Sequence, residues 1–529
     1  MLKRTAHAVI AGALALGATA TTNAVAAAAD HPGPSVVRTD KGAVRGKVTD
    51  SARVFQGVPY AAPPTGRHRW APPAPAARWH GVLDATAPGS ACPQTGLVPP
   101  AGPHSDNEDC LFVNVTTPRT AAAGRPRPVM VYLHGGDHTD GAGAMQDAQR
   151  LAARGDVVVV TVNHRLGALG YLAHPELEKR GGESGNYGFL DQQAALRWVQ
   201  RNAIAFGGDP DNVTLFGESA GGYSACAHLV APTSAGLFDR VVLQSAPCTS
   251  GTGRRDREDA LEEGVTIAAG IEEKPGVDDW RTAAPEHLVN PFGTGPEYAP
   301  VYGGKLLPRT PEEAFATGRF NKVPVLQGIN RDESRAGIYG MEMTKKATTG
   351  DPDAHIDEAD YGTHLEQTFG ADRADAVAAR YPVTAYDGSP ALALAAALTD
   401  AEWARPTVDT GKALSRHVPT YTYEFAEKET PWYADPAYQK PSFPIGAAHT
   451  FELPYLFGLD DFEPLTRTQH RLSDRMIDIW TGFAHKGRAP WKPTTPAAPN
   501  TQSLASGPNG IRPVDFAENH HYAFWTSLR

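Results

Sequence analysis

One serine of this chain lies in a pattern typical of a catalytic nucleophile. The segment Gly217–Gly221 reads Gly-Glu-Ser-Ala-Gly. The apolar run Asn212–Phe216 before it predicts a buried strand, and Gly222–Val230 after it predicts a helix. At such a strand-to-helix turn only small flanking residues fit, so the serine hydroxyl is exposed above a sheet. We therefore predict that Ser219 is a nucleophile.

A serine hydroxyl reacts poorly at neutral pH unless a base takes its proton and an acid holds that base. With the nucleophile on such a turn, the acid and then a histidine follow later in the chain. Val323–Gly328 predicts a strand, and the acidic segment Asn330–Glu333 follows it. His449 precedes the aromatic run Phe451–Phe457 and lies in a predicted late loop. Because the chain has 19 histidines, order alone leaves other candidates open, namely His485, His520 and His521.

Short apolar runs alternate with helical stretches along most of the chain. This alternation predicts an α/β fold, with a mostly parallel sheet covered by helices on both faces. Helices are expected at Leu190–Asn202 and Thr468–His485. The expected strands are Val129–Leu133, Val157–Val162, Val213–Phe216, Arg240–Gln244, Val323–Gln327 and Tyr421–Phe425.

The same pattern continues to the end of the chain, so residues 30–529 are predicted to form a single catalytic domain. Helical insertions are expected between Gly251 and Phe320 and between Ile338 and Val418. A hairpin of Val36–Thr39 and Ala43–Val48 is expected near the start. Segments rich in Pro and Gly predict surface connections at Pro93–His104, Pro118–Pro128 and Pro490–Pro508.

Residues 1–29 are predicted to be a cleaved signal peptide. Lys3 and Arg4 supply the positive start, Ala8–Ala20 is apolar, and small residues favour cleavage after Ala26 or Ala29. The apolar stretch is shorter than the roughly 20 residues of a membrane span. The protein is therefore expected to be secreted and extracellular, with no membrane span.

The bulk composition describes a globular protein without a basic surface. The formal net charge is −10, with 41% hydrophobic and 20% charged residues, so nucleic acid is not an expected partner. No ligand spacing for a metal is present. We expect a monomer that binds a small molecule.

Four cysteines fit an exported protein, because disulfides persist outside the cytosol. Sequential pairing joins Cys92 with Cys110 and Cys226 with Cys248. The alternative for Cys226 is a buried free thiol on the helix after the serine.

Longer motifs surround these residues, and with them the chain resembles the type-B carboxylesterase family, which has the α/β-hydrolase fold. The similarity runs from the N-terminal hairpin to the last few residues. It is carried by Phe55–Pro64 with Arg69-Trp70, Glu108–Val115, Asn186–Gln192, Phe206–Pro210 and the segment His449–Gly458.

The resemblance implies ester hydrolysis by a triad of Ser219, Glu333 and His449, through an acyl-enzyme and without metal or organic cofactor. Ser334 stands where the family usually has Gly. The resemblance further implies a disulfide Cys92–Cys110 and buried ion pairs Arg69–Glu108 and Arg165–Asp191. Glu218, beside the nucleophile, is expected to act electrostatically near the site.

The loop expected to stabilise the oxyanion departs from the family. His134-Gly135-Gly136 is followed by Asp137-His138, where the family has a third Gly and an aromatic residue. By position, the donors are the backbone N–H groups of Gly136, Asp137 and Ala220. An anion about 6 Å from the oxyanion costs roughly 3 kcal/mol at an effective dielectric of about 20. Asp137 avoids this cost if it turns to solvent, pairs with His138, or meets a cationic substrate. We expect it to turn to solvent, so that replacing it changes turnover only a few-fold.

The sequence thus predicts a secreted serine hydrolase acting on carboxylic esters. One alternative is a lipase acting on longer-chain esters at interfaces. The other is a non-catalytic binding module, if the loop containing Asp137 does not support catalysis.

Overall fold

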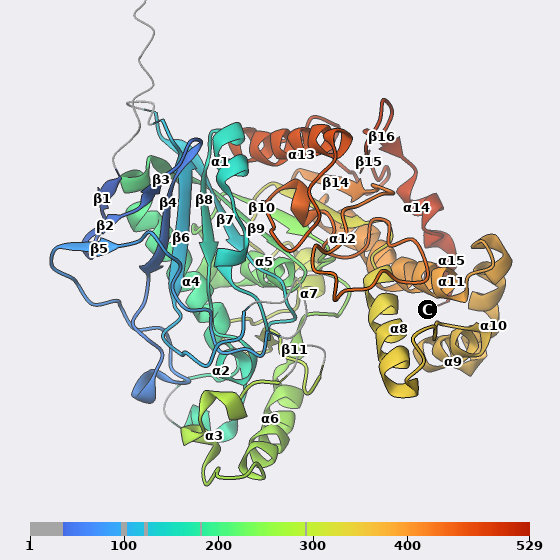
Figure 1. Ribbon diagram of the computed structural model, residues 1–529, viewed down its shortest axis with the longest axis horizontal. Coiled ribbons are helices and arrows are strands. Elements are labelled where there is room, and N and C mark those ends of the chain that lie inside the picture. Colours follow the sequence, from blue (N-terminus) through green and yellow to red (C-terminus); the bar gives the residue numbers. More distant parts are fainter. Residues whose placement is uncertain (1–34, 97–102, 121–124, 180–181, 291–293, 529) are drawn as a thin grey trace, which may run out of the picture.

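An eleven-stranded sheet forms the centre of the structure (Figure 1). The computed structural model describes residues 35–528 except 97–102, 121–124, 180–181 and 291–293. In spatial order, the strands of the sheet are β16 (Arg512–Val514), β15 (Thr501–Leu504), β14 (Thr420–Phe425), β13 (Val325–Asn330), β10 (Arg240–Gln244), β9 (Gly208–Glu218), β7 (Arg127–Leu133), β8 (Val158–Val162), β6 (Phe112–Pro118), β4 (Ala52–Pro59) and β3 (Lys47–Val48).

The middle of this sheet is parallel, as the sequence predicts. The six predicted strands are β14, β13, β10, β9, β7 and β8, and each is parallel to its neighbours in that series. The antiparallel pairs lie at the two edges. The prediction of a surface connection at Pro490–Pro508 is wrong in part. Thr501–Leu504 within it is fully buried and pairs with β14 as the strand β15.

Two smaller sheets flank the main one. The predicted hairpin is confirmed for β1 (Val36–Arg38) and β2 (Ala43–Arg45), which β5 (Val82–Asp84) joins as a third strand. Lys47–Val48, predicted as the end of the second strand, instead pairs with β4 as β3 of the central sheet. The other small sheet pairs β11 (Arg255–Asp256) with β12 (Val301–Tyr302).

Helices cover both faces of the central sheet, because its buried strands are apolar on both sides. In β7, Val129 and Val131 contribute to one hydrophobic cluster and Met130 and Tyr132 to another. The first cluster includes residues of α4 (Tyr187–Asn202) and α5 (Ala220–Val230), and the second includes residues of α1 (Gln149–Gly155) and α13 (Arg467–Lys486).

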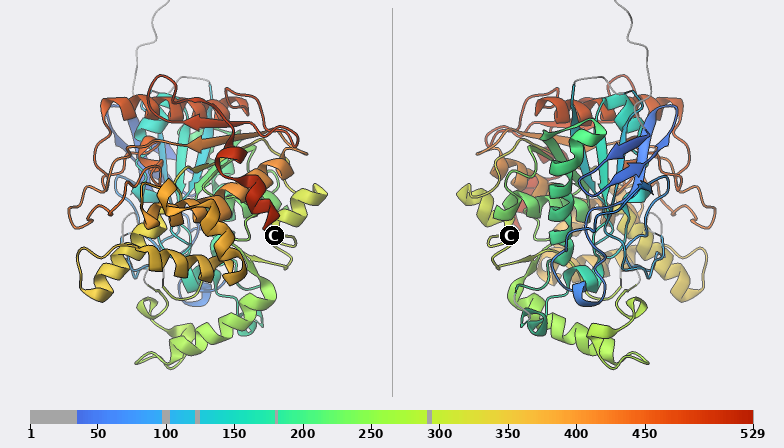
Figure 2. Two further views of the ribbon diagram at one scale, coloured as in Figure 1. Left: turned by 90° about the vertical axis from the view of Figure 1, so that its right-hand side faces the viewer. Right: turned by 90° about the vertical axis from the view of Figure 1, so that its left-hand side faces the viewer.

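The predicted helical insertions are present. The first contains α6 (Arg257–Glu272) and α7 (Pro311–Thr317). The second contains α8 (Arg335–Thr349), α9 (Glu358–Phe369), α10 (Ala371–Arg380), α11 (Pro390–Leu398), the π-helix η8 (Thr399–Ala404) and α12 (Arg405–Leu414). The helix α6 and the group α8 to α10 project from the body of the sheet, whereas α7 and α12 pack against it (Figures 1 and 2). The remaining helices are α2 (Gly167–Tyr171), α3 (Pro175–Glu178), α14 (Phe516–Asn519) and α15 (Tyr522–Ser527). Among the described residues, none of the helices has the length and apolarity that crossing a membrane requires.

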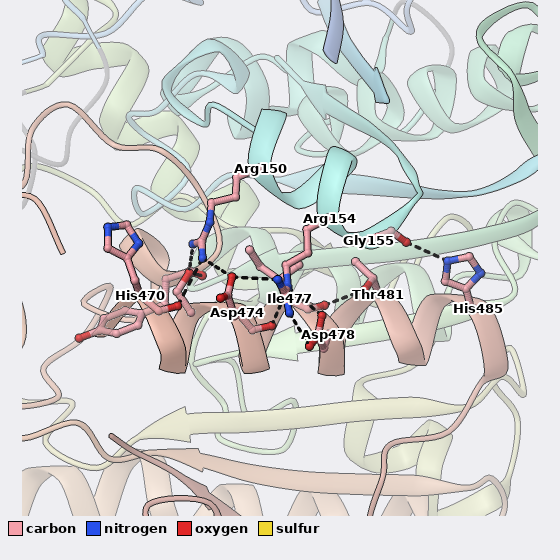
Figure 3. Close-up of polar contacts among 11 residues, drawn as sticks. Arg150, Arg154, Gly155, His470, Asp474, Ile477, Asp478, Thr481 and His485 are labelled. Carbon is pink, nitrogen blue, oxygen red and sulfur yellow. Dashed lines mark hydrogen bonds and ion pairs between the residues drawn. The ribbon is translucent and has the colours of Figure 1, made fainter. Parts of the chain in front are cut away.

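The helices α1 and α13 lie side by side and are joined by ion pairs (Figure 3). Arg150 Nη2 lies 2.6 Å from Asp474 Oδ1, and Arg154 Nε lies 2.8 Å from Asp478 Oδ1. The two helices approach each other closely at Gly155. A Cβ added to this glycine would lie 2.2 Å from Thr481 Cγ2, so a larger residue would not fit. These ion pairs are half exposed, so each adds little to stability.

Two deeper ion pairs hold loops beside the sheet. Arg165 binds Asp191 through two hydrogen bonds of 2.7 Å, and the two side chains are only 2% and 0% exposed. The pair joins the chain after β8 to α4. Arg69 likewise binds Glu108, with one contact of 2.8 Å. Both pairs agree with those implied by the resemblance.

Both disulfides form in the structure. Cys92 is bonded to Cys110 and Cys226 to Cys248. The second bond ties α5 to the segment after β10, so the free-thiol alternative for Cys226 is wrong.

The burial of Arg165 and Asp191 generates a stability prediction. Replacing Asp191 with Asn leaves the Arg165 charge buried and uncompensated, and we expect the free energy of unfolding to fall by about 3–5 kcal/mol. Equilibrium unfolding in denaturant, with the disulfides intact, measures this loss. The matched control is Asp478→Asn, which breaks an exposed ion pair and is expected to cost under about 1 kcal/mol. Equal losses in the two variants would contradict the account.

Candidate active site

Ser219 lies on the turn between β9 and α5, in a strained backbone conformation. Its φ is 53° and its ψ is −125°, a region that residues other than glycine rarely adopt. The turn is tight: a Cβ at Gly217 would lie 2.4 Å from the carbonyl carbon of Gly221. A Cβ at Gly221 would in turn lie 2.0 Å from the Leu133 carbonyl oxygen. The Gly-x-Ser-x-Gly pattern therefore follows from close backbone approach.

His449 and Glu333 come together from two loops at the same edge of the sheet. The imidazole Nδ1–H donates to Glu333 Oε2 at 2.6 Å, and the His449 backbone N–H donates to the Glu333 carbonyl at 3.2 Å. Glu333 Oε1 accepts from Ser245 Oγ at 2.6 Å and from the Asn330 backbone N–H at 2.8 Å. Both oxygens of this carboxylate are thus fixed, and they orient the imidazole.

The other imidazole nitrogen of His449 faces a second carboxylate. Its Nε2 lies 3.3 Å from Glu218 Oε1. Within the part of the chain that the structure describes, no hydrogen bond links His449 to the Ser219 hydroxyl. Trp403 of the π-helix η8 packs on the imidazole, with ring centroids 4.9 Å apart. The structure therefore brings Glu333, His449 and Glu218 into direct contact, with Ser219 next to Glu218 in the chain.

Buried carboxylates dominate the electrostatics around His449. Burial alone lowers the pKa of its imidazole, but Glu218, Glu333 and Glu452 outweigh that effect and raise the pKa to about 10. Burial raises the pKa of Glu218 well above its usual range, although the charge of His449 lowers it. The imidazole and Glu218 therefore titrate as a coupled pair.

Glu452 and Ser245 are site residues to which the sequence assigned no role. Glu452 is fully buried and accepts from Gln244 Nε2 at 3.0 Å and from Asn330 Nδ2 at 2.8 Å. Burial raises its pKa. A signal was present, because Gln244 ends a predicted strand, Ser245 follows it directly, and Glu452 follows His449 by three positions.

The glycine loop after β7 lies directly against Ser219. A Cβ at Gly135 would lie 2.7 Å from Glu218 Oε2 and 3.2 Å from Ser219 Cβ. The following residues Gly136, Asp137 and His138 all have positive φ. Within the described chain, the backbone N–H groups of Gly136 and Asp137 donate to no other group.

Asp137 and His138 point into different surroundings. Asp137 is exposed as a residue, but partial burial of its carboxyl raises the pKa of that group, and the charge of His449 lowers it. His138 is buried, with Nε2 3.1 Å from Ser224 Oγ. Burial lowers its pKa to about 3, so the ring is neutral. Among the described residues no ion pair joins it to Asp137, and the pairing considered from the sequence is wrong.

The alternative histidines are engaged elsewhere. His485 Nε2 contacts the Gly155 carbonyl at 2.9 Å (Figure 3). His520 is buried and lies 2.5 Å from Asp400 Oδ1 and 2.7 Å from Glu424 Oε1. The ring of His521 packs on Tyr381. No cluster of three or more His, Cys, Asp or Glu side chains suited to a metal ion occurs among the described residues.

A mostly parallel sheet with a serine on the turn after a central strand, and a late histidine paired with an acid, defines an α/β-hydrolase. Comparison with known protein families supports this class. The chain belongs to the carboxylesterase family, whose model matches residues 33–525.

Relatives resemble this chain over most of their length. The para-nitrobenzyl esterase of Bacillus subtilis (strain 168) is 35% identical over 479 residues, which cover 85% of this chain and 90% of that protein. The fumonisin B1 esterase of Sphingopyxis macrogoltabida is 35% identical over 501 residues, covering 90% and 86%. The solved structure of a thermophilic PNB esterase gives a TM-score of 0.74 at 32% identity, covering 93% of this chain and all of that one. The chain is thus an ester hydrolase, and the alternative of a non-catalytic binding module is set aside.

The carboxylates around His449 generate a prediction on pH dependence. An imidazole acts as a general base only when neutral, and the charge of Glu218 favours its protonated form. Glu218→Gln removes that charge, so the pKa of His449 falls and neutral imidazole persists to lower pH. We expect the acid limb of the kcat/KM profile for a neutral ester to move to lower pH.

The control for this measurement is Glu366→Gln, at an exposed carboxylate on α9, which should leave the acid limb in place. An unchanged or upward-shifted limb in Glu218→Gln would show that Glu218 does not act on the ionisation of His449.

Proposed function

We propose that this chain is a secreted serine hydrolase that cleaves carboxylic esters with Ser219, His449 and Glu333. The observation that carries the proposal is the 2.6 Å hydrogen bond between His449 and Glu333, beside a serine held on a strained turn. This arrangement supplies a nucleophile, a base and an acid that orients the base.

In the proposed reaction, His449 Nε2 takes the proton of Ser219 Oγ as that oxygen attacks the ester carbonyl. The resulting imidazolium gives the proton to the alcohol oxygen as the carbon–oxygen bond breaks, which leaves an acyl-enzyme. Water then attacks the acyl carbonyl as His449 Nε2 takes its proton, and the imidazolium returns the proton to Ser219 Oγ as the bond between the acyl carbon and that oxygen breaks, which releases the carboxylic acid and restores the serine. Glu333 keeps the Nδ1 proton in place and stabilises the imidazolium. Because catalytic hydrogen bonds often tighten only with substrate bound, His449 Nε2 moves from Glu218 towards Ser219 on binding.

The oxyanion is held by backbone N–H groups of Gly136, Asp137 and Ala220. Two observations support these donors. The loop that carries Gly136 and Asp137 contacts Ser219, and in the described chain the backbone N–H groups of these two residues donate no hydrogen bond. Glu218 stabilises the imidazolium from the side opposite Glu333. The proposed chemistry uses no metal or organic cofactor.

We also propose that residues 30–529 act as one catalytic domain and as a monomer. Residues 1–29, the proposed signal peptide cleaved after Ala26 or Ala29, lie outside the described residues. Two disulfides support export, since such bonds persist in oxidising compartments.

Substitution of the three residues tests the proposed mechanism. Ser219→Ala, His449→Ala and Glu333→Gln are each expected to lower kcat for a 4-nitrophenyl ester by several orders of magnitude, because nucleophile, base and acid act as one unit. The exposed Ser51→Ala is the control and should retain full activity. Near-normal turnover in His449→Ala would show that another residue is the base and would contradict the proposed mechanism.

Acyl-chain length separates the esterase from the lipase alternative. We expect kcat/KM on a series of 4-nitrophenyl esters to peak at short to medium chains and to fall for longer ones. The same series, measured below and above the solubility limit of each ester, shows whether an interface matters. A marked preference for emulsified long-chain esters would establish the lipase instead.

A further inference from the structure

The loop after β7 turns through three successive residues with positive φ, and only the first of them is a glycine. The φ angle is 103° at Gly136, 50° at Asp137 and 56° at His138. Residues with a Cβ rarely adopt this conformation, and where they do, the surrounding structure must hold them in it. The loop that carries two of the proposed oxyanion donors is therefore strained and depends on contacts with the rest of the protein.

Hydrogen bonds within the loop fix its turn but not its place in the site. The carbonyl of Gly136 accepts from the backbone N–H groups of Thr139 and Asp140, each at 2.9 Å. These bonds close the loop on itself and leave its distance from α5 undetermined. Asp137 is exposed as a residue, whereas His138 is only 3% exposed. The contacts that place the loop are therefore to be found at His138.

His138 joins the loop to two helices. Its backbone carbonyl accepts from the N–H group of Gly167, the first residue of α2, at 2.7 Å. Its ring packs edge-on against Tyr171, the last residue of α2, with ring centroids 4.9 Å apart. The ring Nε2 lies 3.1 Å from Ser224 Oγ on α5.

The contact with Ser224 matters because α5 carries the other parts of the site. Ser219 directly precedes α5, Ala220 is its first residue, and Ser224 lies about one turn further on. Because burial lowers the pKa of the His138 imidazole to about 3, the ring is neutral and one of its nitrogens accepts. Ser224 Oγ accepts from Gln192 Nε2 at 3.1 Å, so its own proton is left to donate to His138 Nε2. This hydrogen bond holds the loop and the helix, which supply separate oxyanion donors, at a fixed distance.

The alternative is that the ring of His138 only fills the space between α2 and α5. A phenylalanine ring would fill that space about as well, but it has no nitrogen to accept a hydrogen bond from Ser224. Packing and hydrogen bonding therefore have different consequences in His138→Phe.

We propose that His138 is a positioning residue for ester hydrolysis, whose hydrogen bond with Ser224 aligns the N–H groups of Gly136 and Asp137 with that of Ala220 around the oxyanion. This inference rests on the proposed function and goes beyond it. His138 acts through the loop and takes no part in proton transfer. Its contacts explain how the loop supports catalysis with Asp137, a residue with a Cβ, at a position of positive φ.

A pair of ketone inhibitors tests the alignment of the oxyanion donors without turnover. When Ser219 Oγ adds to the carbonyl carbon of 1,1,1-trifluorooctan-2-one, the serine proton goes to His449 Nε2. The carbonyl oxygen becomes an oxyanion, as in the proposed reaction. Octan-2-one has nearly the same shape but adds far less readily, so it reports on binding alone. We measure the inhibition constant Ki of each ketone and take the ratio, octan-2-one over trifluorooctanone.

We expect His138→Phe and Ser224→Ala each to lower this ratio by about ten- to hundredfold, because displaced oxyanion donors lose that much transition-state stabilisation. The double variant should lose no more than the larger single loss, since both substitutions remove the same hydrogen bond. His138→Gln retains an acceptor for Ser224 and should stay within about threefold of wild type. For a neutral 4-nitrophenyl ester, kcat should fall with the ratio while KM changes little.

Thr494→Val is the matched control, because it also removes a buried hydroxyl from a hydrogen bond. Thr494 Oγ1 lies 3.1 Å from Thr422 Oγ1, and its backbone pairs with Thr420 at the start of β14. The site lies at the opposite ends of the parallel strands. Thr494→Val should therefore lower the free energy of unfolding, measured in denaturant, and keep the wild-type ratio. The same measurement identifies any variant that does not fold. If His138→Phe does not fold, Ser224→Ala decides the outcome, because it leaves the residues of the loop unchanged.

A wild-type ratio in His138→Phe and Ser224→Ala would overturn the proposal, as would single losses that multiply in the double variant or an equal loss in Thr494→Val. Ser219→Ala separates this failure from that of the proposed function. If the trifluoromethyl ketone acts through Ser219 and the His138 and Ser224 variants keep the ratio, only the positioning role of His138 is wrong. If the ketone does not inhibit wild type and Ser219→Ala hydrolyses esters normally, the proposed function itself fails.

Discussion

The burial of several carboxylates around a single imidazole is the constraint on which the rest of the site depends. Glu218, Glu333 and Glu452 are each 1% exposed or less, and each raises the pKa of His449. Buried carboxylates are tolerated only when hydrogen bonds or opposite charges compensate for lost hydration. Asn330 supplies part of that compensation, because its backbone N–H binds Glu333 and its side chain binds Glu452. Ser245 donates to Glu333 and Gln244 to Glu452, and the imidazole contacts Glu333 and Glu218.

The parallel sheet makes this arrangement possible, because the carboxyl ends of neighbouring strands meet at one edge. The loops that follow β7, β9, β10 and β13 carry in turn the glycine loop, Ser219, Ser245 and Glu333. The Cys226–Cys248 bond then fixes α5 to the chain beyond Ser245. Small displacements of any of these loops would alter the contacts of His449, so the rigidity of the sheet and the chemistry of the site are linked.

Local patterns made the turn at Ser219 and the central strands predictable, since strand, turn and helix around Ser219 are adjacent in the chain. The order of acid and then histidine followed from the serine turn, but the choice of Glu333 and His449 among the candidates depended on the family resemblance. Contacts such as Ser245 with Glu333, 88 positions apart, leave no local pattern. The same holds for Trp403 on His449 and for His138, whose ring turned away from Asp137 to a buried place beside Ser224. Thr501–Leu504 was missed as a strand because proline-rich neighbours hide its burial.

Labelling with a fluorophosphonate, followed by peptide mapping by mass spectrometry, identifies the serine that acts as nucleophile. We expect one covalent adduct per molecule, on the hydroxyl of Ser219 within the segment Gly217–Gly221, and loss of ester hydrolysis in proportion to labelling. An adduct on a different serine, or full hydrolysis by folded protein that the reagent does not label, would contradict the proposed role of Ser219.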